Sequence, residues 1–293
     1  MPWLQLSLQI DSTSAREAAD EMEAAGAASV TLEDAEDSPL LEPAPGETPL
    51  WPTVVVTGLF DSEILQDLTR LQESAVWKSR RGFHLSRVPD RAWEREWLKH
   101  FRPRRFGRHL WVCPAGLTPE DDGAGVILTL DPGLAFGTGT HETTALCLQW
   151  LDAHPPENLR VLDFGCGSGI LAIAAALLGA RIVYARDIDP QALEATRNNA
   201  LRNEVADRVL TAPADGEIPG CDLLISNILA GTLMDLAPNF ARALPGGAQV
   251  VLSGILAEQA AAVIEAYSPW FGLQQLAEQD GWILLAGHRQ ETD

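Results

Sequence analysis

Apolar and polar residues alternate at the start of the chain, which is the period of a half-buried β-strand. Over Leu4–Ile10 every second residue is apolar. An Ala- and Glu-rich segment follows. Within it, Ser14 and Glu17 have the spacing of a helix-capping box, and Gly26 is placed to end the helix. The first residues therefore predict a strand followed by an amphipathic helix.

The same kind of pattern continues to about residue 90. Two strands, a helix and a fourth strand are predicted at Ser29–Leu32, Val54–Phe60, Asp61–Leu71 and Phe83–Val88. Ser38–Pro52 contains five prolines and predicts a long loop. The order β-α-β-β-α-β is that of a ferredoxin-like α+β domain, which we assign to residues 1–90.

The next segment is basic and aromatic. Trp93, Trp97 and Phe101 recur every four residues and predict one face of a helix, so residues 91–112 are interpreted as a linker helix region. The net charge is −13 over residues 1–67, +8 over 68–112 and −15 over 113–293, for a total of −20. The total charge disfavours nucleic acid as the main partner. The basic stretch leaves RNA contact open, beside the plainer interpretation as an interdomain packing face.

Residues 113–293 predict a second fold, in which strands and helices alternate. Its expected strands are Arg160–Phe164, Ile182–Ala185, Asp222–Ser226 and Gln249–Ser253, and its expected helices are Ser168–Leu178, Pro190–Leu201 and one running through Asn239–Leu244. Apolar strands alternating with helices predict an α/β fold with a doubly wound, mostly parallel sheet. Phe271–Ala277 and Trp282–Gly287 are joined by a short turn and predict an antiparallel terminal hairpin.

Composition narrows the class of protein. Hydrophobic residues make up 46% of the 293 residues and charged residues 21%, as in a globular protein. The four cysteines are far apart, which disfavours a zinc cluster or a disulfide framework. No apolar run has the length of a membrane span, and no signal peptide is recognised. We expect a cytoplasmic protein, and, without a coiled-coil seam, a monomer.

A glycine-rich turn is the first candidate for chemistry. Gly165, Gly167 and Gly169 lie between the first predicted strand of the sheet and its helix, where the backbone can approach a ligand. Ile170 replaces the small residue of the dinucleotide fingerprint, and the loop has no cation for a pyrophosphate. Asp187, at the end of the next strand, is suited to accept both ribose hydroxyls. The combination favours S-adenosylmethionine. The alternative is tight strand–helix packing with Asp187 as a helix cap.

Asn227 is the second candidate, at the end of the fourth strand of the sheet. Its amide oxygen can accept a hydrogen from an amine nucleophile whose lone pair faces a methyl donor. The alternative is a helix N-cap, a position that Asn also favours.

The third candidate is the Gly/Thr-rich segment Leu130–Thr144, which is suited to fold over a cofactor as a lid. Phe136 and Thr138 are its expected covering residues. His141 is a candidate general base, although a structural hydrogen-bonding role is the commoner one. No second ligand has a workable spacing, so no metal is predicted.

Four blocks, DPGLAFGTGTHETT, LDFGCGSGILAIAA, DIDPQAL and SNILAG, resemble the ribosomal protein L11 methyltransferase (PrmA) family, and the similarity spans nearly the whole chain. The resemblance implies a class I methyltransferase fold, S-adenosylmethionine as cofactor, and cofactor contacts at Thr144, Gly165, Asp187 and Asn227. It also implies that ribosomal protein L11, a basic protein, is methylated on its N-terminal amine and lysine side chains. Arg186 departs from the small or apolar residue that members of this family tend to have at this position.

We therefore expect in-line methyl transfer to an uncharged amine, with Asn227 positioning the amine and Gly167 allowing close approach of the cofactor. The separate domain of residues 1–90 is the expected substrate-recognition domain. One alternative is an RNA or protein-glutamine methyltransferase, but those enzymes usually carry two prolines and an aromatic residue where Ile228–Ala230 follow here. Another is a non-catalytic S-adenosylmethionine-binding protein, which would be expected to have lost the glycine turn or Asp187.

Overall fold

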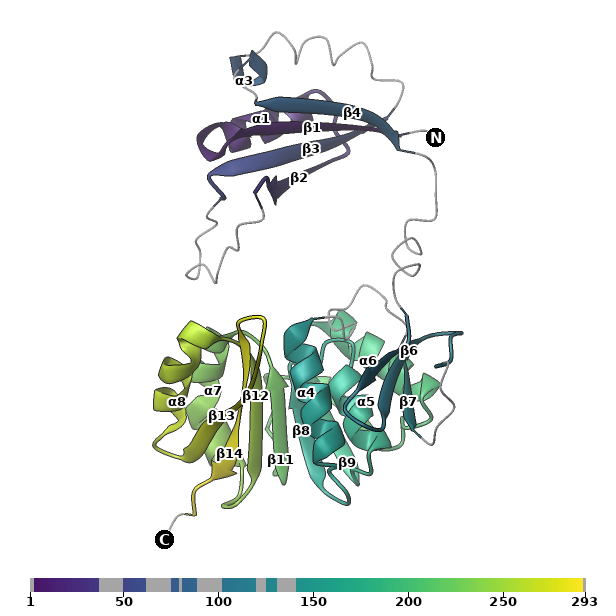
Figure 1. Cartoon of the computed structure of the whole chain (residues 1–293), viewed down its shortest axis with the longest axis vertical. Coiled ribbons are helices and arrows are strands. Elements are labelled where there is room, and N and C mark those ends of the chain that lie inside the picture. The colour runs from purple at the N-terminus through teal and green to yellow at the C-terminus, as the bar shows by residue number, and fades with distance from the viewer. Residues whose placement is uncertain are drawn as a thin grey trace. The chain divides into compact units, whose positions relative to one another are not determined.

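The structure is a computed structural model that describes residues 3–36, 50–61, 75–78, 81–88, 102–119, 125–130 and 141–291. The chain divides into two compact units, Met1–Glu94 and Arg95–Asp293, and each is described by itself (Figure 1). The predicted helix at Asp61–Leu71, the helix carrying Trp93, Trp97 and Phe101, and most of the Pro-rich loop lie outside the described residues.

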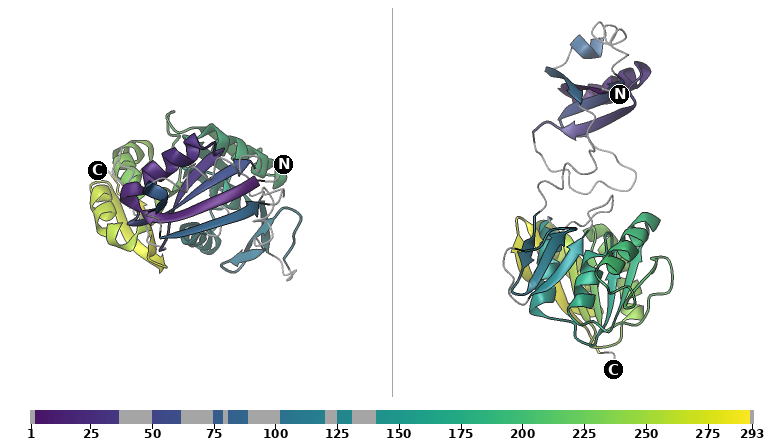
Figure 2. Two further views of the ribbon diagram at one scale, coloured as in Figure 1. Left: turned by 90° about the horizontal axis from the view of Figure 1, so that it is seen from above. Right: turned by 90° about the vertical axis from the view of Figure 1, so that its right-hand side faces the viewer.

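The first unit is built on a four-stranded antiparallel sheet in the order β2-β3-β1-β4 (Figure 1 and Figure 2). Its elements are β1 (Trp3–Asp11), α1 (Ser12–Ala24), β2 (Ser29–Asp34), β3 (Thr53–Asp61), α3 (Ala75–Lys78) and β4 (Gly82–Val88). The alternating pattern places Leu6 and Leu8 in a core with Met22 of α1. The strand order is that of the ferredoxin-like arrangement, so the predicted fold class of this unit is confirmed.

The predicted start of α1 was wrong by three residues. The helix begins at Ser12, and Asp11 is its N-cap without a side-chain cap hydrogen bond. Ser14 and Glu17 therefore lie inside the helix and form no capping box at its start. The capping-box spacing also occurs within helices, so the motif alone did not fix the boundary.

The second unit contains a seven-stranded sheet in the order β10-β9-β8-β11-β12-β14-β13 (Figure 1). The strands are β8 (Arg160–Phe164), β9 (Ile182–Asp187), β10 (Val209–Pro213), β11 (Leu223–Asn227), β12 (Gln249–Leu256), β13 (Phe271–Gln279) and β14 (Trp282–Arg289). Strands β8 to β12 pair in parallel, whereas β14 pairs antiparallel with both β12 and β13. The doubly wound sheet and its terminal hairpin are as predicted. Strand β10 had no distinct sequence signal, because it is a short edge strand in which Leu210 is exposed.

Helices cover both faces of this sheet. The helices are α4 (Glu142–Ala153), α5 (Ile170–Leu177), α6 (Pro190–Arg202), α7 (Ala230–Ala243) and α8 (Ala260–Tyr267), with a short 3₁₀ turn, η4 (Ala257–Gln259), before α8. Residues of α4, α5 and α6 share one core, and residues of α7 and α8 share another. Within β9, Val183 and Ala185 belong to the first core, whereas Tyr184 packs against the second. Burial on both faces explains why the strands are apolar without alternation.

A small three-stranded sheet precedes α4 and shows that residues 104–112, in the second half of the expected linker helix region, form strands and a turn. It consists of β5 (Arg104–Phe106), β6 (Leu110–Pro114) and β7 (Val126–Leu130) in the order β5-β6-β7. Arg104 and Arg105 are exposed, and their guanidinium groups lie 5.4 Å and 5.9 Å from the ring centroids of Phe106 and Trp111. The sequence did not predict this strand, because it has three residues and two of them are exposed arginines.

Asp152 of α4 holds the turn between β5 and β6. Its buried carboxylate accepts hydrogen bonds from the backbone N–H groups of Arg108, His109 and Leu110 at 2.6, 3.0 and 2.9 Å. Gly107 lies against the same carboxylate, and a Cβ there would come within 2.2 Å of Asp152 Oδ2. The small sheet is thus fixed to the helix that also carries Thr144.

Asp152→Ala is expected to lower the free energy of unfolding by more than about 3 kcal/mol, because three backbone donors lose a charged acceptor. Urea denaturation measures the effect. The matched control is Asp235→Ala, which removes an exposed carboxylate from α7 and is expected to change stability by less than about 0.5 kcal/mol. Equal effects of the two substitutions would contradict the role of Asp152.

Candidate active site

The glycine turn between β8 and α5 has a backbone that only glycine adopts easily. Gly165, Gly167 and Gly169 have φ angles of +81°, +53° and +81°. The N–H groups of Gly165 and Cys166 donate to the carbonyl oxygen of Arg186 at 2.8 and 3.0 Å. A Cβ at Gly165 would come within 2.2 Å of Ile228 Cγ2. The turn is therefore tied to β9 and packed against the residue that follows Asn227.

Two buried side chains of α6 donate hydrogen bonds to the glycine turn. Thr196 Oγ1 donates to the carbonyl oxygen of Gly167 at 3.1 Å, and Asn199 Nδ2 donates to that of Ser168 at 3.0 Å. Thr196 and Asn199 are three residues apart and therefore lie on one face of the helix. Neither residue was predicted from the sequence. The available signal was the presence of two polar side chains, three residues apart, on an otherwise apolar face of the helix.

Asp187 lies at the carboxyl end of β9 and faces the glycine turn. Its Oδ2 accepts the N–H of Gly167 at 2.9 Å, and its Oδ1 accepts the N–H of Asp189 at 3.0 Å. Asp189, and not Asp187, caps α6 by accepting the N–H of Gln191. Ile188, between the two carboxylates, is 88% exposed and offers an apolar surface beside Asp187.

Asn227 ends β11 and contacts α4. Its Nδ2 donates to Thr144 Oγ1 at 3.2 Å, and Thr144 itself is buried. The residue that caps α7 is Leu229, so Asn227 is not the N-cap that the sequence left open. Because β11 lies between β8 and β12, Asn227 is close to the glycine turn on one side and to Ser253, its register partner, on the other.

These contacts bring Thr144, Gly165, Gly167, Asp187 and Asn227 together at the carboxyl edge of the parallel strands, where ligands bind in doubly wound sheets. Phe136 and Thr138 lie outside the described residues. His141 is the N-cap of α4. Its Nδ1 lies 3.3 Å from Thr143 N and 2.8 Å from Thr143 Oγ1, and its ring meets Trp282 edge-on at 5.1 Å. These contacts favour the structural role of His141.

Arg186 holds the glycine turn through its main chain. The two turn N–H groups bond to its carbonyl oxygen, while its side chain donates from Nη2 to the carbonyl oxygen of Glu217 at 3.2 Å. Replacing a small residue by Arg at this position therefore leaves the hydrogen bonds of the turn unchanged, since they are made by the backbone.

Asp163, inside β8, is a buried carboxyl group that sequence analysis did not single out. Its Oδ2 accepts the N–H of Ala172 in α5 at 2.9 Å, and its Oδ1 has no hydrogen-bond partner among the described residues. Burial, with a smaller contribution from the charge of Asp187, raises the pKa of Asp163 to about 7. A carboxyl residue within an apolar run was the signal available in the sequence.

This raised pKa predicts a pH-dependent stability. The folded state holds the Asp163 proton more tightly than the unfolded chain, so the stabilisation is complete below about pH 4 and is lost as the pH rises through about 7. Asp163→Asn is expected to remove this component of the pH dependence. Urea denaturation of both proteins between pH 5 and about 8.5 tests it, and parallel curves would contradict it.

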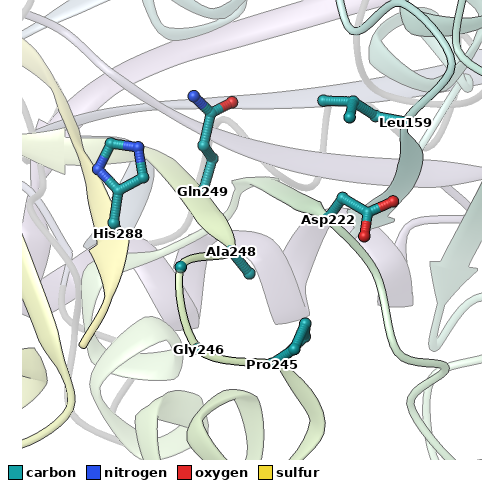
Figure 3. A pocket seen from close by; sticks show the side chains of 8 residues that line it. Leu159, Asp222, Pro245, Gly246, Ala248, Gln249 and His288 are labelled. Carbon is teal, nitrogen blue, oxygen red and sulfur yellow. The ribbon is translucent and has the colours of Figure 1, made fainter. Parts of the chain in front are cut away.

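The cavity in Figure 3 lies at the opposite edge of the sheet. It has a volume of about 410 Å³, and Asp222, Gln249 and His288 are among its lining residues. Asp222 precedes β11 and Gln249 begins β12, so the cavity is at the amino ends of the parallel strands. Arg160 donates to both carboxylate oxygens of Asp222, which lowers the pKa of Asp222. This cavity is therefore separate from the candidate active site.

Among the described residues, no three His, Cys, Asp or Glu side chains gather as a metal site requires. No helix in the described part of the chain is long and apolar enough to cross a membrane.

The doubly wound sheet with its antiparallel hairpin, the glycine turn after β8 and the carboxylate after β9 define a class I S-adenosylmethionine-dependent methyltransferase. The family model described as ribosomal protein L11 methyltransferase (PrmA) matches residues 2–290. The chain belongs to this family, and its cofactor is S-adenosyl-L-methionine.

Two relatives match nearly the full length of the chain, and one crystal structure matches about two thirds of it. The chain is 50% identical to the ribosomal protein L11 methyltransferase of Methylococcus capsulatus over 295 residues, which cover 98% of this chain and 99% of the relative. It is 47% identical to that of Escherichia coli, with 99% and 100% covered. A crystal structure of ribosomal protein L11 methylase from Lactobacillus delbrueckii subsp. bulgaricus matches with 34% identity and a TM-score of 0.58, covering 65% of this chain and all of that one.

Proposed function

We propose that this protein transfers methyl groups from S-adenosylmethionine to amines of ribosomal protein L11, namely its N-terminal α-amine and lysine side chains. The observation that carries the proposal is the position of Asn227. Its neutral amide lies at the carboxyl end of β11, anchored to Thr144 and adjacent to the glycine turn. An uncharged acceptor at this point suits an amine that must keep its lone pair free.

The residues around the turn fit the cofactor. Asp187 faces the glycine turn at the carboxyl edge of the sheet, and its carboxylate is suited to two ribose hydroxyls. The exposed apolar side chain of Ile188, next to Asp187, would be available for contact with the adenine ring. When bound, S-adenosylmethionine supplies a methyl group already activated on a sulfonium.

The remaining work of the site is to position an amine and keep it uncharged. A free lysine has a pKa of about 10.4 and an α-amine one of about 7.7–8.0, so most lysine amines are protonated at neutral pH. Removing water from around the amine lowers its pKa. Asn227 then accepts one N–H of the neutral amine and directs its lone pair, and alignment with the methyl group provides most of the acceleration.

Recognition of the substrate is assigned to the domain of residues 1–90, which is separate from the methyltransferase fold. The substrate is a basic protein, and residues 1–90 have a net charge of −10, so the charges are complementary. We expect the enzyme to act as a cytoplasmic monomer, without membrane contact and without direct RNA binding by residues 68–112.

The proposal is tested by incubating the protein with tritiated S-adenosylmethionine and an equimolar mixture of bacterial ribosomal proteins and rRNA. Label is expected in protein L11. Label in rRNA would refute the proposal and support the RNA methyltransferase alternative.

A further inference from the structure

Ile228, which directly follows Asn227, lies between two glycines of neighbouring strands. On the β8 side its side chain covers Gly165, whose Cβ would come within 2.2 Å of Ile228 Cγ2. On the β12 side its backbone covers Gly254, whose Cβ would come within 2.3 Å of the Ile228 carbonyl oxygen and 2.8 Å of its carbonyl carbon. Ile228 therefore occupies the space that a side chain would need both at Gly165, after β8, and at Gly254, in β12.

Gly254 is unusual within its strand. It has a φ of +80°, in the left-handed region, and it lies where the pairing of β12 with β14 shifts register between Leu252 and Ile255. A regular strand residue would have φ near −120° and a side chain. The bulge turns the strand so that a bare α-carbon faces Asn227 and Ile228.

The contact extends to the functional amide itself. A Cβ at Gly254 would lie 3.1 Å from Asn227 Oδ1. That oxygen is the acceptor that the proposed function assigns to the amine, whereas Nδ2 on the other side of the amide donates to Thr144. Thr144 and Gly254 therefore lie on opposite sides of the same amide group.

We infer that Gly254 is a positioning residue for methyl transfer: its missing side chain lets the Ile228 carbonyl and the Asn227 amide oxygen lie against β12, in the orientation that the amine needs. The inference rests on the proposed role of Asn227. A side chain at position 254 displaces the backbone of Ile228, because the nearest atoms are main-chain atoms that cannot move aside alone.

The test compares Gly254→Ala with Gly247→Ala. Gly247 has nearly the same φ, +78°, but a Cβ added there would have no atom within 4 Å. Gly247→Ala therefore has the cost of a left-handed φ and does not have the steric clash. With L11 as substrate, Gly254→Ala is expected to lower kcat roughly 30-fold, since a displacement of about 1 Å near reacting atoms costs up to about 100-fold. The Kd for S-adenosylhomocysteine, measured by calorimetry, is expected to change less than about threefold. Gly247→Ala is expected to leave both constants within about threefold of the parent.

A second readout is independent of activity. The side-chain amide resonances of Asn227, identified by their absence from Asn227→Ala, are expected to shift in Gly254→Ala and to stay in place in Gly247→Ala. Unshifted Asn227 resonances in Gly254→Ala, or equal losses of kcat in the two variants, would overturn the inference. A parent enzyme that does not methylate L11 would instead refute the proposed function, and the resonances would still decide whether Gly254 positions the amide.

If thermal melting shows that Gly254→Ala does not fold, Ile228→Ala takes its place. This change removes the side chain that lies on Gly165 and keeps the backbone on Gly254. Because the inference assigns the positioning to the backbone contact with Gly254, the Asn227 resonances are expected to stay in place and kcat to change less than about threefold. A loss of kcat of about 30-fold or more, with shifted Asn227 resonances, would assign the positioning to the Gly165 contact and overturn the inference.

Discussion

Asn227→Ala is expected to lower kcat with ribosomal protein L11 by between about 100- and 1,000-fold, the usual cost of removing one fixed dipole from a site where charge develops. In the proposed mechanism the amine gains positive charge as it takes the methyl group, and the amide oxygen of Asn227 is the acceptor that faces this charge. Binding of S-adenosylhomocysteine is expected to weaken less than about tenfold, since the glycine turn and Asp187 remain. Steady-state kinetics and calorimetry give the two values.

The conservative variant Asn227→Asp separates positioning from structural support. It keeps an acceptor oxygen but adds a negative charge, which favours the protonated amine and raises its pKa. We expect the pH profile of kcat/KM to move to higher pH relative to the parent. An unshifted profile with near-normal activity would show that Asn227 does not contact the amine.

Asp187→Ala is expected to weaken binding of S-adenosylhomocysteine by at least about 100-fold, because two hydroxyl groups lose a charged acceptor and each such bond contributes about 1.5–3 kcal/mol. The variant also frees the N–H of Gly167, which the Asp187 carboxylate accepts at 2.9 Å. At saturating cofactor, kcat is expected to fall much less than affinity. Isothermal titration calorimetry measures the loss.

Asp189→Ser is the matched control for Asp187→Ala. It removes a carboxylate two residues away and keeps the cap of α6, because Ser is also a favoured N-cap. Its affinity for S-adenosylhomocysteine is expected to stay within about threefold of the parent. Similar losses in the two variants would mean that the negative charge of the segment, and not the position of Asp187, binds the cofactor.

The fold was predictable where the period of apolar residues was clean. The alternation of Leu4–Ile10 indicates burial of one face of a strand, and the continuous apolar runs at β8, β11 and β12 indicate burial of both faces. Each pattern can be recognised in the sequence alone. The small sheet β5–β7 was missed because its first strand has only three residues, two of them exposed arginines. A strand this short has no period to recognise.

The site was predictable in its parts but not in its assembly. Gly165, Asp187 and Asn227 each follow a predicted strand, and the carboxyl ends of parallel strands share one edge. The supporting residues Thr196, Asp163 and Gly254 come from a helix, a strand interior and a bulge. Their roles depend on which backbone atoms they meet, and this follows from the pairing register, which the local sequence does not contain.

The central claim is that the acceptor is an amine of L11, and intact-mass spectrometry tests it most directly. Purified L11 and L11 whose amines have been chemically acetylated are incubated with the enzyme and S-adenosylmethionine. The account predicts mass increments of whole methyl groups on untreated L11 and none on acetylated L11. Methylation of acetylated L11, or no methylation of untreated L11, would contradict it.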